Sequence, residues 1–416
     1  TVETTPNESG VTTSLLAAVA CPTGSSTCVA AGQYYTPDED HLLAIRKKPS
    51  GTWSITPVPG SVTPAATYLN GAGCSTSGCI AVGESFPANN FNTSAAIEQW
   101  NGSKWSLAKS AEPAGAVTTN LYGASCPTTK LCYAVGSVGI GTAGDDGETN
   151  NFAEKWNGSK WSTEAAQDPS GDNVNELTGV SCAGDSACTA VGYGESSQGG
   201  SPTAVAEILT KTNWSVQTPE SPAGAISTSL TGISCPAPSN CVAVGSFEDA
   251  SDVTEPLAET WNGSTWTAIE PPQPSGTTGN ELLGVSCASS GTCTAVGDSS
   301  LSNGTEVTLA EQLSGGSWSI TATQNPSAGT EQVVLTGVAC TSTVACTAAG
   351  YLVGSSGDET LLELWNGATW SLVTSGTVAG DFATGLNGIA CSAVACTAVG
   401  SGPDGLGQDD ALVEQN

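Results

Sequence analysis

The feature that most constrains the fold is a regular series of cysteine pairs. The sixteen cysteines form eight close pairs, and the first members of successive pairs lie 51 to 56 residues apart in the 416-residue chain. An internal repeat of this length is typical of the blades of a β-propeller. The pairs are Cys21 with Cys28, Cys74 with Cys79, Cys126 with Cys132, Cys182 with Cys188, Cys235 with Cys241, Cys287 with Cys293, Cys340 with Cys346 and Cys391 with Cys396.

The residues around each pair recur as four short segments. In the fifth repeat these are Leu230-Thr-Gly-Ile-Ser-Cys235, Cys241-Val-Ala-Val-Gly245, Leu257-Ala-Glu-Thr-Trp261 and a segment that begins at Trp266. Short apolar and β-branched runs separated by turn residues predict four strands, A to D, per repeat. The cysteine hairpin joins A to B, and an Asn-Gly turn joins C to D. No run has helical periodicity over three turns.

The two ends of the chain indicate a closed ring. The eighth repeat stops after strand C, at Leu412–Asn416, whereas Thr1-Val-Glu-Thr-Thr-Pro6 resembles the D strand Ser215-Val-Gln-Thr-Pro219. Closure removes exposed sheet edges. We therefore predict one domain over 1–416, an all-β, eight-bladed β-propeller with four antiparallel strands per blade, whose N-terminal strand completes the last blade. The blades are expected at 13–57, 66–110, 118–165, 174–219, 227–271, 279–322, 332–375 and 383–416 plus 1–6.

Other architectures fit the repeat less well. A stack of eight small sandwiches would need about 100 residues for each immunoglobulin-like domain, and a parallel β-helix would need a much shorter period.

The cysteine pairs are interpreted as disulfides, one per blade. Zinc would need four ligands converging from two repeats, and a single histidine, His41, cannot supply the rest. Each bridge closes a short loop and stabilises its hairpin by about 2 kcal/mol. Disulfides persist in oxidising compartments, so we expect an extracellular or cell-surface protein. The sequence has no methionine and no visible signal peptide, which suggests a processed mature chain.

Composition excludes several partners and chemistries. The 39 acidic and 9 basic residues give a formal charge of -30, which argues against nucleic acid. No apolar run approaches the roughly 20 residues of a membrane span. One histidine and one arginine, Arg46, disfavour most acid-base, metal and anion-binding chemistry. All nine basic residues lie between Arg46 and Lys211, so the second half of the chain has none.

Strand C contains a repeated glutamate seven residues before the tryptophan of strand D. The members are Glu98, Glu154, Glu207, Glu259, Glu311 and Glu363, with Glu414 equivalent in the eighth repeat and Arg46 in the first. These positions belong to separate blades, well over about 10 Å apart, whereas paired-carboxylate chemistry works at about 5 to 9.5 Å. A structural role is therefore favoured over a cation-binding ring, with hydrogen bonds from a neighbouring blade or a tryptophan N–H. The eleven tryptophans and His41 are also interpreted as structural.

The loops between strands B and C, and between D and A, are variable and acidic. Asp145, Asp146 and Glu148 are candidate calcium ligands. They lack the spacing of a known calcium loop, so solvated acidic loops are favoured and no cofactor is predicted. Candidate glycosylation sites are Asn7, Asn92, Asn101, Asn157, Asn213, Asn262 and Asn303. Three of these, Asn101, Asn157 and Asn262, begin Asn-Gly-Ser turns, which by themselves explain the asparagine.

The hairpin between strands C and D resembles that of a known group of propellers. Trp100-Asn-Gly-Ser-Lys-Trp105 and Trp261-Asn-Gly-Ser-Thr-Trp266, each preceded by an Ala-Val-Gly strand, are similar to Asp-box and photosystem-assembly-factor propeller repeats, which have Gly-x-x-Trp at this turn. The Asp of the box is replaced here by tryptophan. The resemblance implies the fold only, because the arginine cluster of sialidases has no counterpart in a chain whose single arginine is Arg46.

Three functions compete. The regular, stapled repeats favour a non-catalytic secreted or cell-surface scaffold or binding protein, including a self-assembling subunit of an extracellular structure in which the first strand completes a neighbouring copy. Its expected partners are a protein or glycan at the cell surface, or other copies. A lectin would use loop aromatics, for which the candidates are Tyr34, Tyr35, Phe86, Phe91, Tyr193, Phe247 and Tyr351. A polysaccharide-active enzyme would need a non-repeated carboxylate pair in the central depression, and the sequence shows none.

Overall fold

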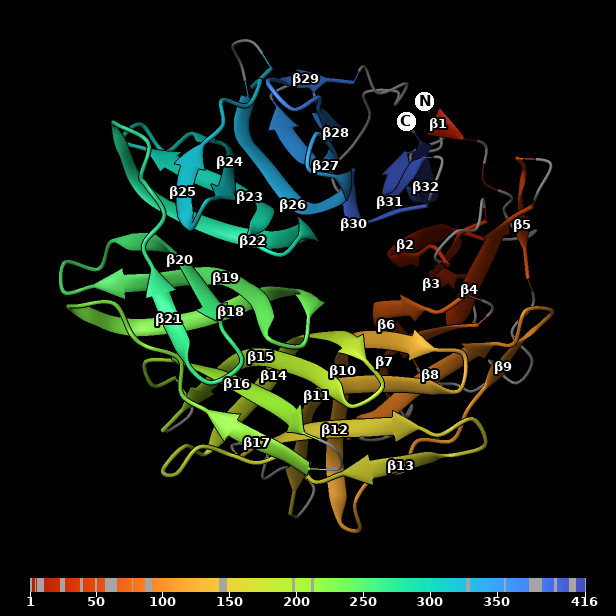
Figure 1. Ribbon diagram of the computed structural model, residues 1–416. Coiled ribbons are helices and arrows are strands. Elements are labelled where there is room, and N and C mark those ends of the chain that lie inside the picture. Colours follow the sequence, from red (N-terminus) through yellow and green to blue (C-terminus); the bar gives the residue numbers. More distant parts are fainter. Residues whose placement is uncertain are drawn as a thin grey trace.

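The computed structural model is a ring of eight four-stranded antiparallel sheets around a central axis (Figure 1). It describes residues 2–3, 5, 11–22, 27–37, 40–48, 51–56, 66–76, 78–86, 92–141, 148–196, 199–210, 213–326, 330–354, 357–373, 384–392, 395–403 and 409–415. The predicted eight-bladed β-propeller is confirmed. Within these ranges no helix has the length and apolar character needed to cross a membrane.

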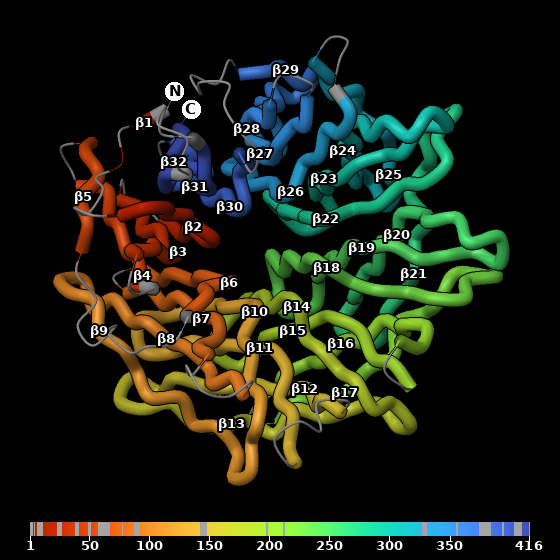
Figure 2. The backbone as a smooth tube through the Cα atoms, turned by 180° about the vertical axis from the view of Figure 1, so that it is seen from behind, coloured from red at the N-terminus to blue at the C-terminus, as the bar shows by residue number. Residues whose placement is uncertain are grey.

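Each blade places strand A nearest the axis and strand D at the rim, as seen from either side of the disc (Figures 1 and 2). The A strands are β2 (Thr13–Ala20), β6 (Ala66–Cys74), β10 (Ala116–Thr128), β14 (Val174–Gly184), β18 (Ala225–Ala237), β22 (Thr277–Ser289), β26 (Thr330–Ser342) and β30 (Gly385–Cys391). The B strands are β3 (Val29–Tyr35), β7 (Cys79–Phe86), β11 (Leu131–Ile140), β15 (Ala187–Glu195), β19 (Asn240–Asp249), β23 (Thr292–Leu301), β27 (Ala345–Gly354) and β31 (Cys396–Pro403).

The outer half of each blade is the C–D hairpin. The C strands are β4 (Asp40–Lys47), β8 (Ser94–Trp100), β12 (Asn150–Trp156), β16 (Thr203–Thr210), β20 (Thr254–Trp261), β24 (Glu306–Ser314), β28 (Gly357–Trp365) and β32 (Asp409–Gln415). The D strands are β5 (Trp53–Ile55), β9 (Trp105–Leu107), β13 (Trp161–Glu164), β17 (Asn213–Gln217), β21 (Trp266–Ile269), β25 (Ser317–Ile320), β29 (Trp370–Leu372) and, for the last blade, β1 (Val2–Glu3).

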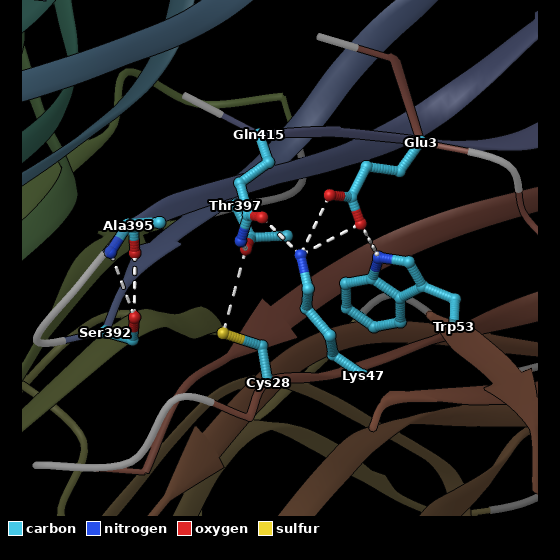
Figure 3. Close-up of polar contacts among 8 residues, drawn as sticks. All are labelled: Glu3, Cys28, Lys47, Trp53, Ser392, Ala395, Thr397 and Gln415. Carbon is cyan, nitrogen blue, oxygen red and sulfur yellow. Dashed lines mark hydrogen bonds and ion pairs between the residues drawn. The ribbon is translucent and has the colours of Figure 1, made fainter. Parts of the chain in front are cut away.

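The N-terminal strand closes the ring, as predicted. β1 pairs with β32 of the same chain, with Glu3 opposite Val413. The Glu3 carboxylate lies 2.9 Å from Lys47 Nζ and accepts a 2.8 Å hydrogen bond from Trp53 Nε1, so it joins the last blade to the first (Figure 3). Lys47 also donates to Gln415 at the end of β32. We call the junction of the eighth blade with the first the seam. Strand pairing between β1 and β32 completes the eighth blade, and the ion pair holds that blade to the first.

The apolar core lies between the blades. Eight clusters of buried side chains occur in the described parts of the chain, one at each junction of neighbouring blades, including that of the eighth with the first. Each contains the leucine that stands five residues before the first cysteine of a pair, such as Leu230. The strand-D tryptophans lie in seven of the clusters, as Trp266 does. The repeated apolar residues therefore form the interface between one blade and the next.

A bulge in every A strand explains the glycine of the Ala-Val-Gly segment. In the fifth blade the register shifts between Leu230 and Gly232, opposite Gly245 of strand B. A Cβ atom on Gly245 would lie 2.0 Å from the carbonyl oxygen of Ser229, so no larger residue fits there without moving the backbone. The same contact recurs at the equivalent glycine of each blade.

The residue extruded by the bulge reaches the next blade. Thr231 Oγ1 donates a 2.9 Å hydrogen bond to the carbonyl oxygen of Leu282, and Asn387 Nδ2 donates one of 3.3 Å to that of Leu16 across the seam. We call this position the latch residue. Asn70, Thr178 and Thr336 make equivalent bonds in their blades.

All sixteen cysteines are paired, one disulfide across each A–B hairpin, as predicted. The hairpins are further tied to their neighbours by the serine that precedes the first cysteine. For example, Cys235 N–H donates a 3.0 Å hydrogen bond to Ser181 Oγ of the preceding blade.

Candidate functional site

The predicted disulfide cysteines are structural residues and do not form a surface site. The second cysteine of four pairs is only 1% exposed, at Cys28, Cys188, Cys241 and Cys293. Each of these side chains packs inside a blade junction or beside one, as Cys28 does where Thr397 Oγ1 of the eighth blade donates a 3.7 Å hydrogen bond to its Sγ (Figure 3). Cys28 and Cys293 are therefore enclosed by the core, and their bridges hold the A–B hairpins together.

The repeated glutamates of strand C are internal to the ring. All seven, from Glu98 to Glu414, are fully buried. Four accept hydrogen bonds from the preceding blade: Glu154 from Ala111 N at 2.9 Å, Glu207 from Gln167 N at 3.1 Å, Glu363 from Gln324 N at 3.0 Å, and Glu414 from Thr360 Oγ1. Glu98, Glu259 and Glu311 have no hydrogen-bond partner among the described residues.

Burial dominates the ionisation of these carboxyl groups. It raises the pKa values of Glu98, Glu207, Glu259 and Glu311 to about 8. It raises those of Glu154 and Glu363 to about 7, because hydrogen bonds to the carboxylate oppose the effect of burial. Groups so enclosed cannot meet a ligand, and their position agrees with a structural role.

The prediction that Arg46 replaces this glutamate in the first blade is wrong. Ile45 stands opposite Ala30, as Glu98 stands opposite Ala81 in the second blade. The reason is the C–D turn of the first blade, in which Lys47 pairs with Trp53 and five residues intervene, instead of the four between Trp100 and Trp105. Arg46 lies one position further along, with its guanidinium 5.1 Å from the ring centre of Trp100 in the second blade.

The candidate calcium ligands are only partly covered by the structure. Asp145 and Asp146 lie outside the described residues, and Glu148 is exposed just before β12. Over the described ranges, no group of three or more His, Cys, Asp or Glu side chains is arranged to hold a metal ion.

The asparagines of the Asn-Gly-Ser turns organise those turns. Asn101 Oδ1 accepts hydrogen bonds from the backbone N–H groups of Ser103, at 3.0 Å, and Lys104, at 3.1 Å. Asn157 and Asn262 act in the same way, and so does Asn366, which is followed by Gly-Ala and is not a sequon. Asn213 and Asn303 are exposed, Asn92 is half-buried beside β8, and Asn7 lies outside the described residues.

The loop aromatics considered for a lectin are not exposed platforms. Phe247 is buried in the core, and Tyr34, Tyr35, Phe86, Tyr193 and Tyr351 are half-buried. Tyr34 stacks on His41, with ring centres 4.7 Å apart, so His41 serves as a packing partner within the first blade. Phe91 lies outside the described residues.

Non-repeated side chains instead gather beside the bulges of strand A. The first tyrosine–carboxylate cluster spans blades two to four and contains Asn70, Glu84, Tyr122, Glu176 and Tyr193. Glu176 lies beside Tyr122 of the preceding blade and beside Tyr193, which stands opposite it on β15. Burial and the charge of Glu176 raise the pKa values of both tyrosines to about 12. In the third blade, the latch residue is Tyr122, which belongs to this cluster.

The second tyrosine–carboxylate cluster lies in blades six and seven and contains Glu281, Asp298, Glu306 and Tyr351. Glu281 and Asp298 stand directly opposite each other on β22 and β23. Burial, followed by the charges of Glu281 and Glu306, raises the pKa of Asp298 to about 8. The protonated form of Asp298 is therefore favoured at neutral pH.

Sequence reasoning missed both clusters. It found no non-repeated carboxylate pair, yet Glu281 and Asp298 form one. The signal was present: Glu84, Glu176, Glu281 and Asp298 all stand next to the invariant Leu or Gly of their strand, at positions where the other blades have unrelated residues.

Comparisons with known proteins support the fold alone. No protein family and no curated protein matches the sequence. Sqt1 of Chaetomium thermophilum, solved with the N-terminus of ribosomal protein L10, superposes with a TM-score of 0.55 at 11% identity over 98% of this chain and 97% of its own. The BP39L lectin of Burkholderia pseudomallei gives 0.51 at 11% identity over 87% of this chain and 99% of its own.

A prolyl endopeptidase gives a TM-score of 0.53 at 12% identity over 94% of this chain, which spans 55% of that enzyme. Propellers similar to this one therefore include a protein-binding protein, a lectin and part of a peptidase. The resemblance to Asp-box repeats receives no support beyond the propeller fold.

Proposed function

We propose that this protein is a non-catalytic binding protein of the extracellular space or the cell surface, and that its ring is a rigid scaffold for a ligand-binding surface. The observation that carries the proposal is the pairing of all sixteen cysteines, one bridge in each blade. Such bridges form and persist in oxidising compartments. Each also constrains an A–B hairpin that contacts its neighbours, which favours a frame that holds its surface still.

Each repeat has recurring structural positions and variable positions, and this difference supports a binding role. The leucine, latch and serine positions contact a neighbouring blade, and the glycine faces a carbonyl oxygen of its own A strand. Residues that differ between blades include the polar and aromatic side chains of the two tyrosine–carboxylate clusters, most of which are half-buried. Variable side chains on a rigid scaffold are the usual location of binding sites. The expected partners remain a protein or glycan of the cell surface, or further copies of the chain.

The Glu281–Asp298 pair is the group whose chemistry most resembles a catalytic site, so it provides the test. The two residues stand opposite each other on β22 and β23, and a buried carboxyl group with a pKa of about 8, as at Asp298, is the kind of group that acts as a general acid. We expect the purified protein to cleave no bond in a panel of polysaccharides and peptides. Turnover that disappears in Asp298→Asn would overturn the non-catalytic assignment.

The location is tested separately. In cells that produce the protein naturally, fractionation should place it in the medium or the cell envelope, and alkylation without reduction should modify no cysteine. A cytosolic protein with sixteen reactive thiols would contradict the proposal.

A further inference from the structure

A groove between the second and third blades differs in charge from the molecule around it. Two adjoining hollows of about 340 and 490 Å³ share Gln99 of β8 and Trp156 of β12 as walls. The first hollow opens beside the A–B hairpin of the third blade, next to Lys130. The second follows the chain after β9, between Lys109 and Lys160. We call the two hollows together the blade 2–3 groove.

The blade 2–3 groove is basic in a strongly acidic protein. Its described lining residues include Lys109, Lys130 and Lys160 and no carboxylate, although the chain carries 39 acidic residues against 9 basic ones. All three lysines are exposed, and none forms an ion pair with a described residue. Their ammonium groups are therefore available to a ligand. Three cations around one groove, within a molecule of formal charge -30, favour an anionic ligand at this place.

Trp156 gives the groove an aromatic wall. Three of the four tryptophans that end a C strand, Trp100, Trp261 and Trp365, are buried, whereas Trp156 is half-buried between the two hollows. Its ring centre is 6.0 Å from that of Trp161, which is buried and supports it from the neighbouring strand. The part of the Trp156 indole that remains exposed in the groove offers an apolar surface for a flat ligand, such as the C–H face of a sugar ring.

The groove between blades seven and eight that corresponds to the first hollow lacks these charged features. It has a volume of about 580 Å³ and uses the corresponding repeat residues, with Trp365 and Asn366 in place of Trp100 and Asn101. Leu364 replaces Gln99. Val344 stands two residues before Cys346 of the seventh blade, just as Lys130 stands two residues before Cys132 of the third. Its described lining contains no charged side chain. Two blade junctions therefore have a groove of this kind, and the one between blades two and three is lined by lysines, amides and the half-buried Trp156.

We propose that the blade 2–3 groove binds an anionic saccharide, a glycan with carboxylate groups on its sugar rings. The three lysines would contact its carboxylates, Gln99 and Asn101 its hydroxyl groups, and Trp156 the apolar face of one ring. This inference rests on the proposed binding function and names its ligand class. A second copy of the chain, whose Lys-free half is acidic, is the alternative occupant that the experiment distinguishes.

The experiment is titration calorimetry of the disulfide-intact protein with tetrasaccharides of galacturonate, mannuronate and hyaluronate. The matched neutral ligand is the fully methyl-esterified form of whichever tetrasaccharide binds, and sodium sulfate is the matched small anion. We expect one site per chain for at least one acidic tetrasaccharide, with affinity that falls as salt is raised. The ester and sulfate should compete at least about tenfold less well.

Variants assign the site. Lys130→Ser with Lys160→Ser should weaken binding by at least about tenfold, since each lysine makes a charge-assisted contact. Trp156→Leu should weaken it while leaving the salt dependence unchanged. Lys48→Ser removes an exposed lysine of the first blade and should change nothing. Equal thermal melting of all variants establishes that they are folded.

Four results would overturn the inference. These are no binding to any acidic tetrasaccharide at millimolar concentration, equal binding of acid and ester, sulfate competing as well as the saccharide, and self-association of the chain that is lost in the lysine variant. The proposed function fails on other evidence, namely catalytic turnover or a cytosolic location, so the two failures can be told apart.

Discussion

The buried glutamates make the stability of the ring depend on pH, and Glu259 gives the sharpest test. It is fully buried, and neither carboxylate oxygen has a hydrogen-bond partner among the described residues. Burial, followed by the charge of Glu220, raises its pKa from 4.5 to about 8. The perturbation is Glu259→Gln, which keeps the shape of the side chain and removes its charge at every pH.

The sign follows from proton binding. Because the pKa is higher in the folded state, the folded protein holds this proton between pH 4.5 and about 8 and the unfolded chain releases it. The stabilisation is therefore fully present below pH 4.5 and is lost as pH rises through about 8. Each unit of pKa shift corresponds to about 1.4 kcal/mol, so a shift of this size gives an upper limit of about 5 kcal/mol for one glutamate.

The assay is urea unfolding of wild type and Glu259→Gln at intervals from pH 5 to 9. The variant should match wild type within about 1 kcal/mol at pH 5, and its advantage should grow by about 1.4 kcal/mol per pH unit up to pH 8. Glu270→Gln, at an exposed glutamate after β21, is the matched control and should track wild type. A gap between Glu259→Gln and wild type that stays flat over this range would refute the argument, because Glu259 would then titrate as it does in the unfolded chain.

Four other substitutions test the frame by urea unfolding at fixed pH. Gly245→Ala should destabilise by about 3 kcal/mol, since its Cβ would lie 2.0 Å from the Ser229 carbonyl oxygen; a neutral effect would contradict the bulge. Thr231→Val should cost about 1 to 2 kcal/mol by removing the latch to Leu282, and rescue by Thr231→Ser would confirm the hydrogen bond. Replacing Cys182 and Cys188 by alanine should cost about 2 kcal/mol; an unchanged urea midpoint would argue against a stabilising bridge. Glu3→Ala should cost about 3 kcal/mol because it leaves Lys47 buried without its ion pair, and a loss no larger than for Lys48→Ala would show that the seam does not depend on this contact.

The sequence predicts the blades and their disulfides well because the residues that form them recur in each blade. Leu230 and Gly245 recur in every blade, since the leucine packs in an inter-blade cluster and the glycine faces a carbonyl oxygen. Eight copies of one pattern allow the strands, the disulfides and the closing strand to be read by comparison within the chain. The physical reason is that a propeller repeats its contacts, so it repeats the residues that make them.

The prediction for Arg46 failed because the first blade departs from the repeat. Counting back from Trp53 assumes a constant turn length, and the first blade has one extra residue in its C–D turn. Hydrogen-bond register then places Ile45 at the glutamate position, in an apolar cluster with Trp53 and Val413 at the seam. The first blade therefore closes its junction with the eighth by apolar packing and by the Lys47–Glu3 pair, with Ile45 at the position where the other blades have a buried glutamate.

The candidate binding surfaces were beyond sequence reasoning because they join residues from different blades. Glu176 meets Tyr122 across a blade junction, although 54 residues separate them in the sequence. Lys130 and Gln99 line one hollow for the same reason. None of these side chains is part of the repeat, so comparison between blades cannot pair them.

The distribution of lysine links these surfaces to the frame. A lysine inside a blade junction is a buried cation that needs a partner, and Lys47 has one in Glu3. Lys109, Lys130 and Lys160 lie outside the junctions, exposed along one groove, where the ring gains nothing from their charge. The chain has only nine basic residues, and three of them lie beside Trp156, the one half-buried member of four equivalent tryptophans, where the proposed anionic ligand would contact them.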